Sequence, residues 1–238
     1  MKKIAKIIAY LFGGLVLIVL LAFTFLYVMV DQEIPEGTQG EIADTLANNV
    51  LEAIHHQKYQ ETQFLAWTFR NKNQYVWDRF NQTVEVRWDE YSCKLLLANP
   101  GESTVFKNEV AISNNDKQPL IDKALSNFHN DSFWLVAPHK LFEPGISRKF
   151  VDLNTEQKGL LITYSSGGTT PGDSYLWKIG QNNLPVSYQM WVSILPIGGL
   201  EVSWDQWKTM ESGTLLSTAH QAMGIQLPLV SDVRAWNE

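Results

Sequence analysis

The first thirty residues constrain this chain most strongly, because they hold an uncharged apolar run from Ile7 to Val30. A helix of that length extends about 36 Å at about 1.5 Å per residue, enough to cross a hydrocarbon core of roughly 30 Å. Lysines precede the run and acidic residues follow it. By the positive-inside rule, this asymmetry predicts one membrane-spanning helix whose N-terminus is cytoplasmic and whose following chain is extracytoplasmic.

A cleaved secretory signal peptide is the alternative interpretation of the same run. Such a peptide has a shorter apolar region and ends in a cleavage site of small residues. Here the run ends in bulky side chains, from Phe25 to Val30. We therefore predict an uncleaved signal anchor over residues 1–30, a polar stalk over 31–40 and one globular domain over 41–238.

The composition of the domain argues against several classes of protein. The whole chain has a formal charge of −6, and three of its basic residues precede the apolar run, which leaves −9 for the remainder. An acidic surface repels nucleic acid, so we expect no nucleic-acid partner. Cys93 is the only cysteine, which excludes an intramolecular disulfide and a cysteine-based zinc site. The histidines show no metal-ligand spacing, and we expect no metal and no other cofactor.

The spacing of apolar residues divides the domain into helices and many short strands. Helical spacing recurs over 41–58 and over 116–130, and the second segment continues as a broken helical element to Phe142. The other segments are short, rich in aromatic and β-branched residues, and separated by polar turns. We predict strands at about 64–70, 74–78, 83–89, 92–98, 104–112, 147–153, 158–165, 173–180, 185–195, 199–208, 212–221 and 226–236.

The predicted fold class is mainly β, with about eleven antiparallel strands. Adjacent strands that are joined by tight turns must be antiparallel. This number of strands is larger than a flat open sheet can hold. We therefore expect a curled sheet or an incomplete β-barrel, with a leading helix and a mid-chain helical lid.

Two stretches carry a resemblance to a known family. Residues 130–145 read NDSFWLVAPHKLFEPG, which is similar to an aromatic…P-x-K-L-x-[DE]-P stretch of LolA-like envelope proteins. Residues 168–177 read GTTPGDSYLW, which is similar to the D-x-Y-x-[YW] strand of the same proteins. With the order of its elements, the chain resembles the LolA/LolB-like superfamily of periplasmic lipoprotein carriers and outer-membrane receptors.

The resemblance implies an incomplete antiparallel barrel whose interior holds acyl chains and whose helical segments close its mouth. Together with the anchor, it implies a single-pass protein of the bacterial inner membrane with its C-terminal domain in the periplasm. The chain departs from the carriers in keeping its own anchor, so a freely diffusing shuttle is not implied.

Alternation along the strands predicts the side chains of the inward face. These are Val84, Val86, Trp88, Leu95, Leu97, Tyr175, Trp177, Ile179, Val202 and Trp204. If the interior is hollow, we expect the ligand to contact Val86, Trp88, Leu95, Leu97, Phe133, Trp134, Tyr175, Trp177 and Trp204. If it is solid, the same side chains fill a core.

Three polar residues are candidates for the rim of such a cavity: His139, Glu143 and Asp173. The stretch that holds the first two could act as a lid. A purely structural interpretation makes Asp131 or Ser132 a helix N-cap and Pro144-Gly145 a turn.

Two loops are distinctive. Residues 167–173 are rich in glycine but lack the Gly-Lys-Ser/Thr of a phosphate-binding loop and precede a strand, so we predict a hairpin connection with glycine in left-handed conformations. The apolar turn 195–200 is either a tip that contacts a membrane or partner, or a turn buried under a neighbouring loop.

No catalytic motif stands out. A G-x-S-x-G elbow is missing, and no two carboxylates are singled out as an acid–base pair. We expect a non-enzymatic, membrane-tethered binding protein for a lipid-like or other apolar ligand, such as a lipid or a lipoprotein. The alternatives are an envelope scaffold or assembly protein with a filled barrel, and a hydrolase that acts on envelope lipids or glycans. The sequence names no protein partner.

Overall fold

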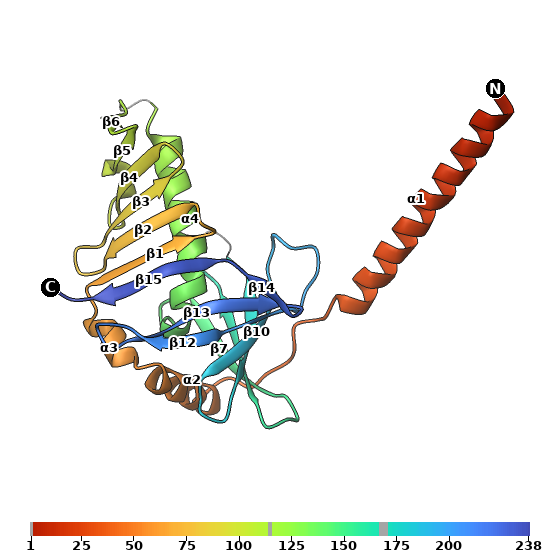
Figure 1. Cartoon of the computed structure of the whole chain (residues 1–238). Coiled ribbons are helices and arrows are strands. Elements are labelled where there is room, and N and C mark those ends of the chain that lie inside the picture. Colours follow the sequence, from red (N-terminus) through yellow and green to blue (C-terminus); the bar gives the residue numbers. More distant parts are fainter. Residues whose placement is uncertain (1, 114–115, 167–170) are drawn as a thin grey trace.

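A computed structural model describes residues 2–113, 116–166 and 171–238. The helices are α1 (Lys2–Val30), α2 (Glu41–Ala53), α3 (His56–Glu61) and α4 (Gln118–Val136), with short 3-10 turns at η1 (Pro100–Glu102) and η2 (Ala137–His139). Figure 1 shows α1 projecting away from the β-rich remainder of the chain. Within the described part of the chain, no helix combines the length and the apolar character needed to cross a membrane.

Fifteen strands form three antiparallel sheets across these described residues, and none of the sheets is closed. The seven-stranded sheet, in spatial order, contains β15 (Val230–Trp236), β1 (Phe64–Phe69), β2 (Asn73–Asp78), β3 (Thr83–Trp88), β4 (Tyr91–Leu96), β5 (Thr104–Lys107) and β6 (Val110–Ala111). The five-stranded sheet contains β11 (Leu200–Ser203), β10 (Pro185–Trp191), β9 (Ser174–Ile179), β8 (Lys158–Tyr164) and β7 (Ile146–Asp152). The three-stranded sheet contains β12 (Asp205–Thr209), β13 (Leu215–Ala222) and β14 (Ile225–Leu227).

The small sheet connects the two large ones. Strand β13 lies beside β11 of the five-stranded sheet and beside β15 of the seven-stranded sheet. The three sheets therefore follow one another as a curled surface, with α4 behind the seven-stranded sheet (Figure 1). The predicted fold class, a mainly β protein with a curled antiparallel sheet, is confirmed.

The described residues contain fifteen strands because three of the twelve predicted segments are each divided into two. Asn108 and Glu109 adopt positive φ and turn the chain between β5 and β6. The segment 199–208 is divided at Trp204 into β11 and β12. A tight turn, in which Leu229 N donates to Leu227 O, separates β14 from β15.

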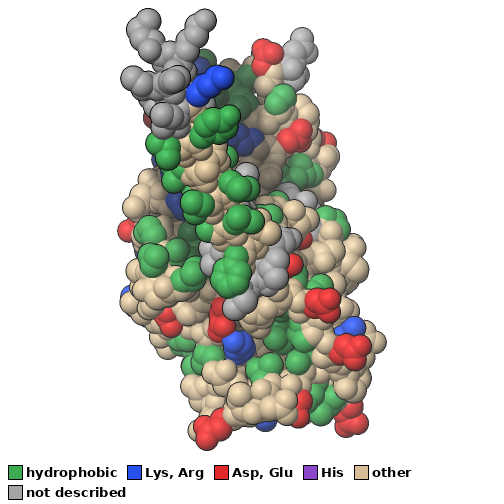
Figure 2. All heavy atoms as spheres, turned by 90° about the vertical axis from the view of Figure 1, so that its right-hand side faces the viewer, with side chains coloured by type: hydrophobic (Ala, Val, Ile, Leu, Met, Phe, Trp, Pro, Cys, Tyr) green, Lys and Arg blue, Asp and Glu red, His purple; other side chains and the backbone are tan. Residues whose placement is uncertain are grey.

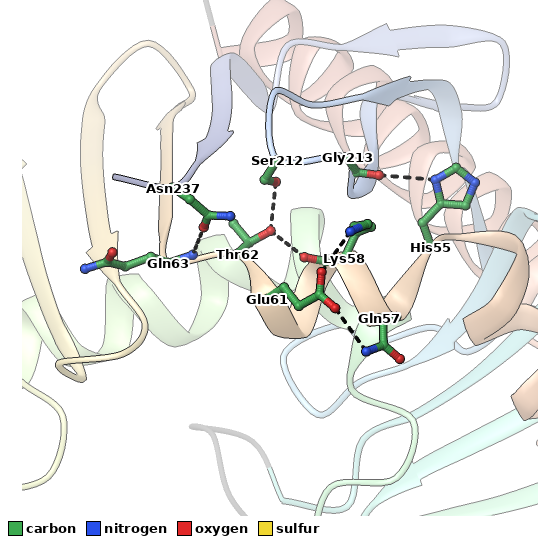
Figure 3. Close-up of polar contacts among 9 residues, drawn as sticks. All are labelled: His55, Gln57, Lys58, Glu61, Thr62, Gln63, Ser212, Gly213 and Asn237. Carbon is green, nitrogen blue, oxygen red and sulfur yellow. Dashed lines mark hydrogen bonds and ion pairs between the residues drawn. The ribbon is translucent and has the colours of Figure 1, made fainter.

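The leading helical segment breaks at His55, which adopts a left-handed conformation (φ 56°), so the predicted helix 41–58 becomes α2 and α3. The His55 ring Nδ1 lies 3.2 Å from the carbonyl oxygen of Gly213, and Thr62 Oγ1 lies 2.7 Å from Ser212 Oγ. Figure 3 shows these contacts, which fix α3 against the turn between β12 and β13. Gln63 N donates to Asn237 Oδ1 at 2.7 Å and fixes the C-terminal end there as well.

The second helical segment was predicted over 116–130 with a broken continuation to Phe142. In the structure the unbroken helix α4 continues to Val136, and the short turn η2 follows it. The expectation that Asp131 or Ser132 caps a helix is wrong, since both are buried within α4. The Asp131 carboxylate instead accepts hydrogen bonds from Tyr75 Oη at 2.5 Å and Asn73 Nδ2 at 2.8 Å, which joins α4 to β2. The predicted turn at Pro144-Gly145 is confirmed, with Gly145 at φ 82°.

The core has two main parts, one under each large sheet. In the seven-stranded sheet, α4 packs against buried aromatic and aliphatic side chains such as Trp67, Val86 and Leu95. In the five-stranded sheet, the inner face of α2 packs against residues such as Leu160 and Trp177. The predicted inward face is confirmed: nine of its ten residues are buried, and Leu97 packs partly buried against the first cluster.

Candidate functional site

A cavity of about 650 Å³ lies between α4 and the inner face of the five-stranded sheet. The second half of α4 and the loop 140–146 form one side of it. The opposite side comes from β8 to β11, and the hairpin of β13 and β14 completes the wall.

The strand register explains which residues line the cavity. On the five-stranded sheet, Tyr175, Met190 and Leu200 are cross-strand neighbours and form one row of the inner face. The next row on the same face contains Trp177, which pairs with Tyr188. The first row lines the cavity, whereas Trp177 and Tyr188 lie deeper and are fully buried.

Phe133 of α4 is the central aromatic residue of the wall. Its ring centroid lies 4.6 Å from that of Tyr175 and 5.9 Å from that of Tyr188. The Phe133 ring lies edge-on to Tyr164, at 6.4 Å. Aromatic rings prefer offset and edge-to-face contacts of this kind, so this part of the wall is an aromatic cluster around Phe133.

The tyrosine hydroxyls of this region stay protonated at neutral pH. Burial raises the pKa of Tyr175, and the neighbouring Asp173 carboxylate raises it further. Burial also raises the pKa of Tyr164, with smaller contributions from Tyr175 and Glu143. The buried Tyr188 Oη has no hydrogen-bond partner among the residues that the structure describes. These groups can donate a hydrogen bond, but none is prepared to act as a base.

Charged residues line the cavity only in a few places. Asp173 is buried, and its carboxylate accepts a hydrogen bond from Ser193 N at 3.0 Å. Glu143 Oε2 lies 3.7 Å from Lys140 Nζ. His129 Nδ1 is buried and finds no hydrogen-bond partner within residues 2–113, 116–166 and 171–238. Burial, followed by the charge of Lys140, lowers the pKa of this ring. No group of three or more His, Cys, Asp or Glu side chains that could hold a metal ion occurs among the residues the structure describes.

Five of the predicted site residues line the cavity. They are Phe133, Trp134 and Tyr175 of the expected pocket, and Glu143 and Asp173 of the expected rim.

The other predicted site residues lie elsewhere. Val86, Trp88 and Leu95, with Leu97 beside them, belong to the core under the seven-stranded sheet, because α4 covers that face. Trp177 and Trp204 are buried in the second core cluster and are not among the lining residues.

His139 is buried rather than placed at a rim. Its ring stacks on that of Tyr59 at 4.1 Å, and its Nε2 lies 3.1 Å from the carbonyl oxygen of Leu215. Burial lowers the pKa of His139 to about 3.

Several lining residues were not predicted from the sequence. Arg70, Ile194, Ala222 and Leu227 come from turns or strand ends that are far apart in the chain. These residues share one property that could have identified them as lining residues. Each lies at or near a strand terminus, and these termini meet at one end of the curled sheet.

The loop 167–173 was predicted as a hairpin connection. Strands β8 and β9 are antiparallel neighbours, and Gly172 adopts φ 101°, as expected for a left-handed glycine. Gly167 and Gly168 lie outside the described residues. In the turn 195–200, Gly198 hydrogen-bonds to Asp31 and Gln32, just after α1.

Comparison with known proteins gives little further guidance. The sequence matches no family model and no curated protein. Among solved structures, a DUF1329 family protein from Desulfovibrio piger ATCC 29098 is similar, with a TM-score of 0.39 and 8% sequence identity, over 82% of this chain and 93% of that chain. A similarity of this size assigns neither a family nor a function, so we infer the function from the cavity itself.

Proposed function

We propose that this protein is a membrane-tethered binding protein that holds a lipid-like or other apolar molecule between α4 and the five-stranded sheet. The observation that carries the proposal is the cavity of about 650 Å³ with a mainly apolar and aromatic wall. Its volume lies within the roughly 300–1,000 Å³ that is typical of small-molecule sites.

Burial of hydrocarbon would supply the affinity. Each methylene group that leaves water contributes about 0.8 kcal/mol, so a chain of ten such groups would gain about 8 kcal/mol before ordering costs. The polar residues of the cavity would then orient the head of the ligand. No bond of the ligand needs to be broken, and we propose no catalytic role.

The location is part of the same proposal and rests on the sequence. The uncharged run from Ile7 to Val30, with lysines on one side only, is typical of a membrane anchor. In the structure α1 is a separate helix with exposed apolar side chains such as Leu11 and Phe12. Together with the resemblance to LolA/LolB-like proteins, these features support a place on the periplasmic side of a bacterial inner membrane.

The core under the seven-stranded sheet supports the scaffold alternative. The face of the seven-stranded sheet under α4 is a filled core, as a purely structural domain would have. The hydrolase alternative would use the cavity carboxylates Asp173 and Glu143, but each is already engaged, by Ser193 N and by Lys140. Binding remains the function that the cavity supports best.

A direct test is to fill the cavity with a side chain. Ala222 lines the cavity, and Ala222→Trp would place an indole ring in it. The matched control is Ala111→Trp, at an exposed position of β6. The full-length chain, purified in a mild detergent, would be titrated with a fatty acid whose fluorescence increases in apolar surroundings. We expect at least a tenfold weaker affinity for Ala222→Trp and an unchanged affinity for Ala111→Trp. Equal affinities for both variants would contradict the proposal.

A further inference from the structure

The cavity reaches the surface at one end of the curled sheets. Arg70 follows the last residue of β1, Ala222 is the last residue of β13, and Ile194 lies three residues after β10. All three line the cavity, and Arg70 and Ile194 are exposed. The mouth of the cavity is therefore formed where these strands end.

The chain that leaves α1 is fixed at this same end. Asp31 Oδ1 accepts a hydrogen bond from Gly198 N at 2.7 Å, and Gln32 N donates to Gly198 O at 3.1 Å. The indole Nε1 of Trp191 donates to Gln32 O at 2.6 Å. Because Asp31 directly follows the last residue of α1, the C-terminal end of this helix lies within a few ångströms of the turn between β10 and β11.

A smaller cavity lies beside this attachment and shares part of its wall with the larger cavity. Its volume is about 380 Å³, and Asp31 and Gly198 line it. Asp173, Val192 and Leu195 line both this cavity and the larger one. The attachment of α1 is therefore separated from the candidate binding site only by residues that line both cavities.

The mouth carries large apolar side chains that face solvent. Ile194 is 71% exposed, and the hairpin tip between β13 and β14 exposes Met223 to 85% and Ile225 to 67%. We call these three residues the apolar rim. In Figure 1 this hairpin points toward the side from which α1 projects, and Figure 2 shows hydrophobic side chains exposed on that side. Clustered apolar side chains at a surface mark a site of contact with a membrane or a protein.

We propose that the apolar rim rests on the surface of the membrane in which α1 is anchored, so that the cavity opens directly toward its lipids. The attachment of α1 beside the rim favours a bilayer over a protein partner, because a membrane that holds the helix would lie next to this end of the domain. The inference rests on the proposed anchor and binding function, and it adds the route: the ligand passes between bilayer and cavity without crossing water.

The test places a fluorescent probe on the rim of the full-length chain. On a Cys93→Ala background, Ile194→Cys and Met223→Cys would each be labelled with an environment-sensitive dye, and the protein reconstituted in phosphatidylcholine vesicles. The matched control is Phe80→Cys, which is 60% exposed in the turn between β2 and β3, at the opposite end of these strands from Arg70. Lipids with a spin-label quencher near the headgroup would then be added.

We expect at least threefold stronger quenching at both rim positions than at Phe80. Equal quenching at the three positions would overturn the inference. Mass spectrometry of the same samples would measure bound lipid and so separate the two proposals. Bound lipid without stronger quenching at the rim would contradict the membrane-facing mouth but would not contradict the binding function.

A charge on the rim gives a second, independent measurement. Met223→Asp, at a rim position that does not line the cavity, should slow the uptake of a fluorescent fatty acid from vesicles at least fivefold, while the uptake from detergent micelles stays unchanged. An equal rate from vesicles would count against the inference, and a loss of uptake from both sources would point to a damaged cavity and contradict it as well.

Discussion

Trp191 and Gln32 are joined by a hydrogen bond of 2.6 Å from the indole Nε1 to a main-chain carbonyl, although 159 residues separate them in the sequence. Gly198 completes the same contact, since its N–H and C=O bond to Asp31 and Gln32. The chain that follows α1 is therefore fixed to the end of β10 and to the turn between β10 and β11.

Gly198→Ala should separate these two segments. A Cβ at this position would lie 2.7 Å from Gln32 O and would also clash with the Trp191 ring. We expect amide hydrogen exchange of residues 31–34 to become at least tenfold faster, as measured by mass spectrometry. Gly101→Ala is the control, because the nearest side-chain atom to its added Cβ would lie 3.9 Å away. Unchanged exchange in Gly198→Ala would show that the contact is not what orders this segment.

Tyr75→Phe should destabilise the fold by about 1–3 kcal/mol, because it leaves the buried Asp131 carboxylate with one donor fewer. Urea unfolding of the full-length chain in detergent would measure the change. Tyr10→Phe, at an exposed position of α1, should be neutral. A loss below about 0.5 kcal/mol in Tyr75→Phe would mean that water replaces the lost hydroxyl.

Stability should fall as the pH drops below about 6.5. Burial lowers the pKa of His139 to about 3, and it lowers the pKa of His56, His129 and His220 in the same direction. Below pH 6.5, the ordinary pKa of histidine, these side chains bind protons in the unfolded chain but not in the folded one. The free energy of unfolding that is present above pH 6.5 is therefore lost progressively between pH 6.5 and about 3.

His139→Gln should remove part of this dependence. When only the unfolded chain takes up a proton, the free energy of unfolding changes with pH by up to about 1.4 kcal/mol per pH unit. We expect the free energy of unfolding, measured from pH 7 to pH 4, to vary less in this variant. The exposed His55→Asn is the control and should keep the slope of the unmodified chain. An identical slope in His139→Gln would mean that His139 is protonated without unfolding.

Asp173→Asn and Glu143→Gln should both retain ligand if the protein is a binder. Neither carboxylate would donate or accept a proton in simple binding, so affinities should change less than about threefold. Binding would be followed by the fluorescent fatty acid titration, and lipid products by mass spectrometry of the incubated mixture. A lipid or glycan product that the unmodified chain forms and one of these variants does not would favour the hydrolase alternative.

The sequence predicted the secondary structure and the inward faces well, because both depend on local periodicity. Val84, Val86 and Trp88 alternate along β3 and are all buried. The cavity could not be located in the same way. Trp88 and Tyr175 follow the same alternation, yet α4 fills the space next to Trp88 and leaves space next to Tyr175.

The position of α4 depends on contacts between distant segments, such as the hydrogen bonds of Asp131 with Asn73 and Tyr75. No spacing within residues 118–136 indicates these partners. The break of the leading helix at His55 has the same origin, since its partner Gly213 is 158 residues away. The position of α4 and the break at His55 could not be predicted because contacts between residues far apart in the sequence determine them.

Native mass spectrometry of the full-length chain tests the central claim most directly. The protein would be purified from membranes in a mild detergent, and its mass compared before and after organic extraction, with Ala222→Trp and Ala111→Trp treated in the same way. We predict a lipid-mass adduct that extraction removes, that Ala111→Trp retains and that Ala222→Trp lacks. An unliganded mass for the unmodified chain, even after incubation with envelope lipids, would contradict the claim that this cavity is a binding site.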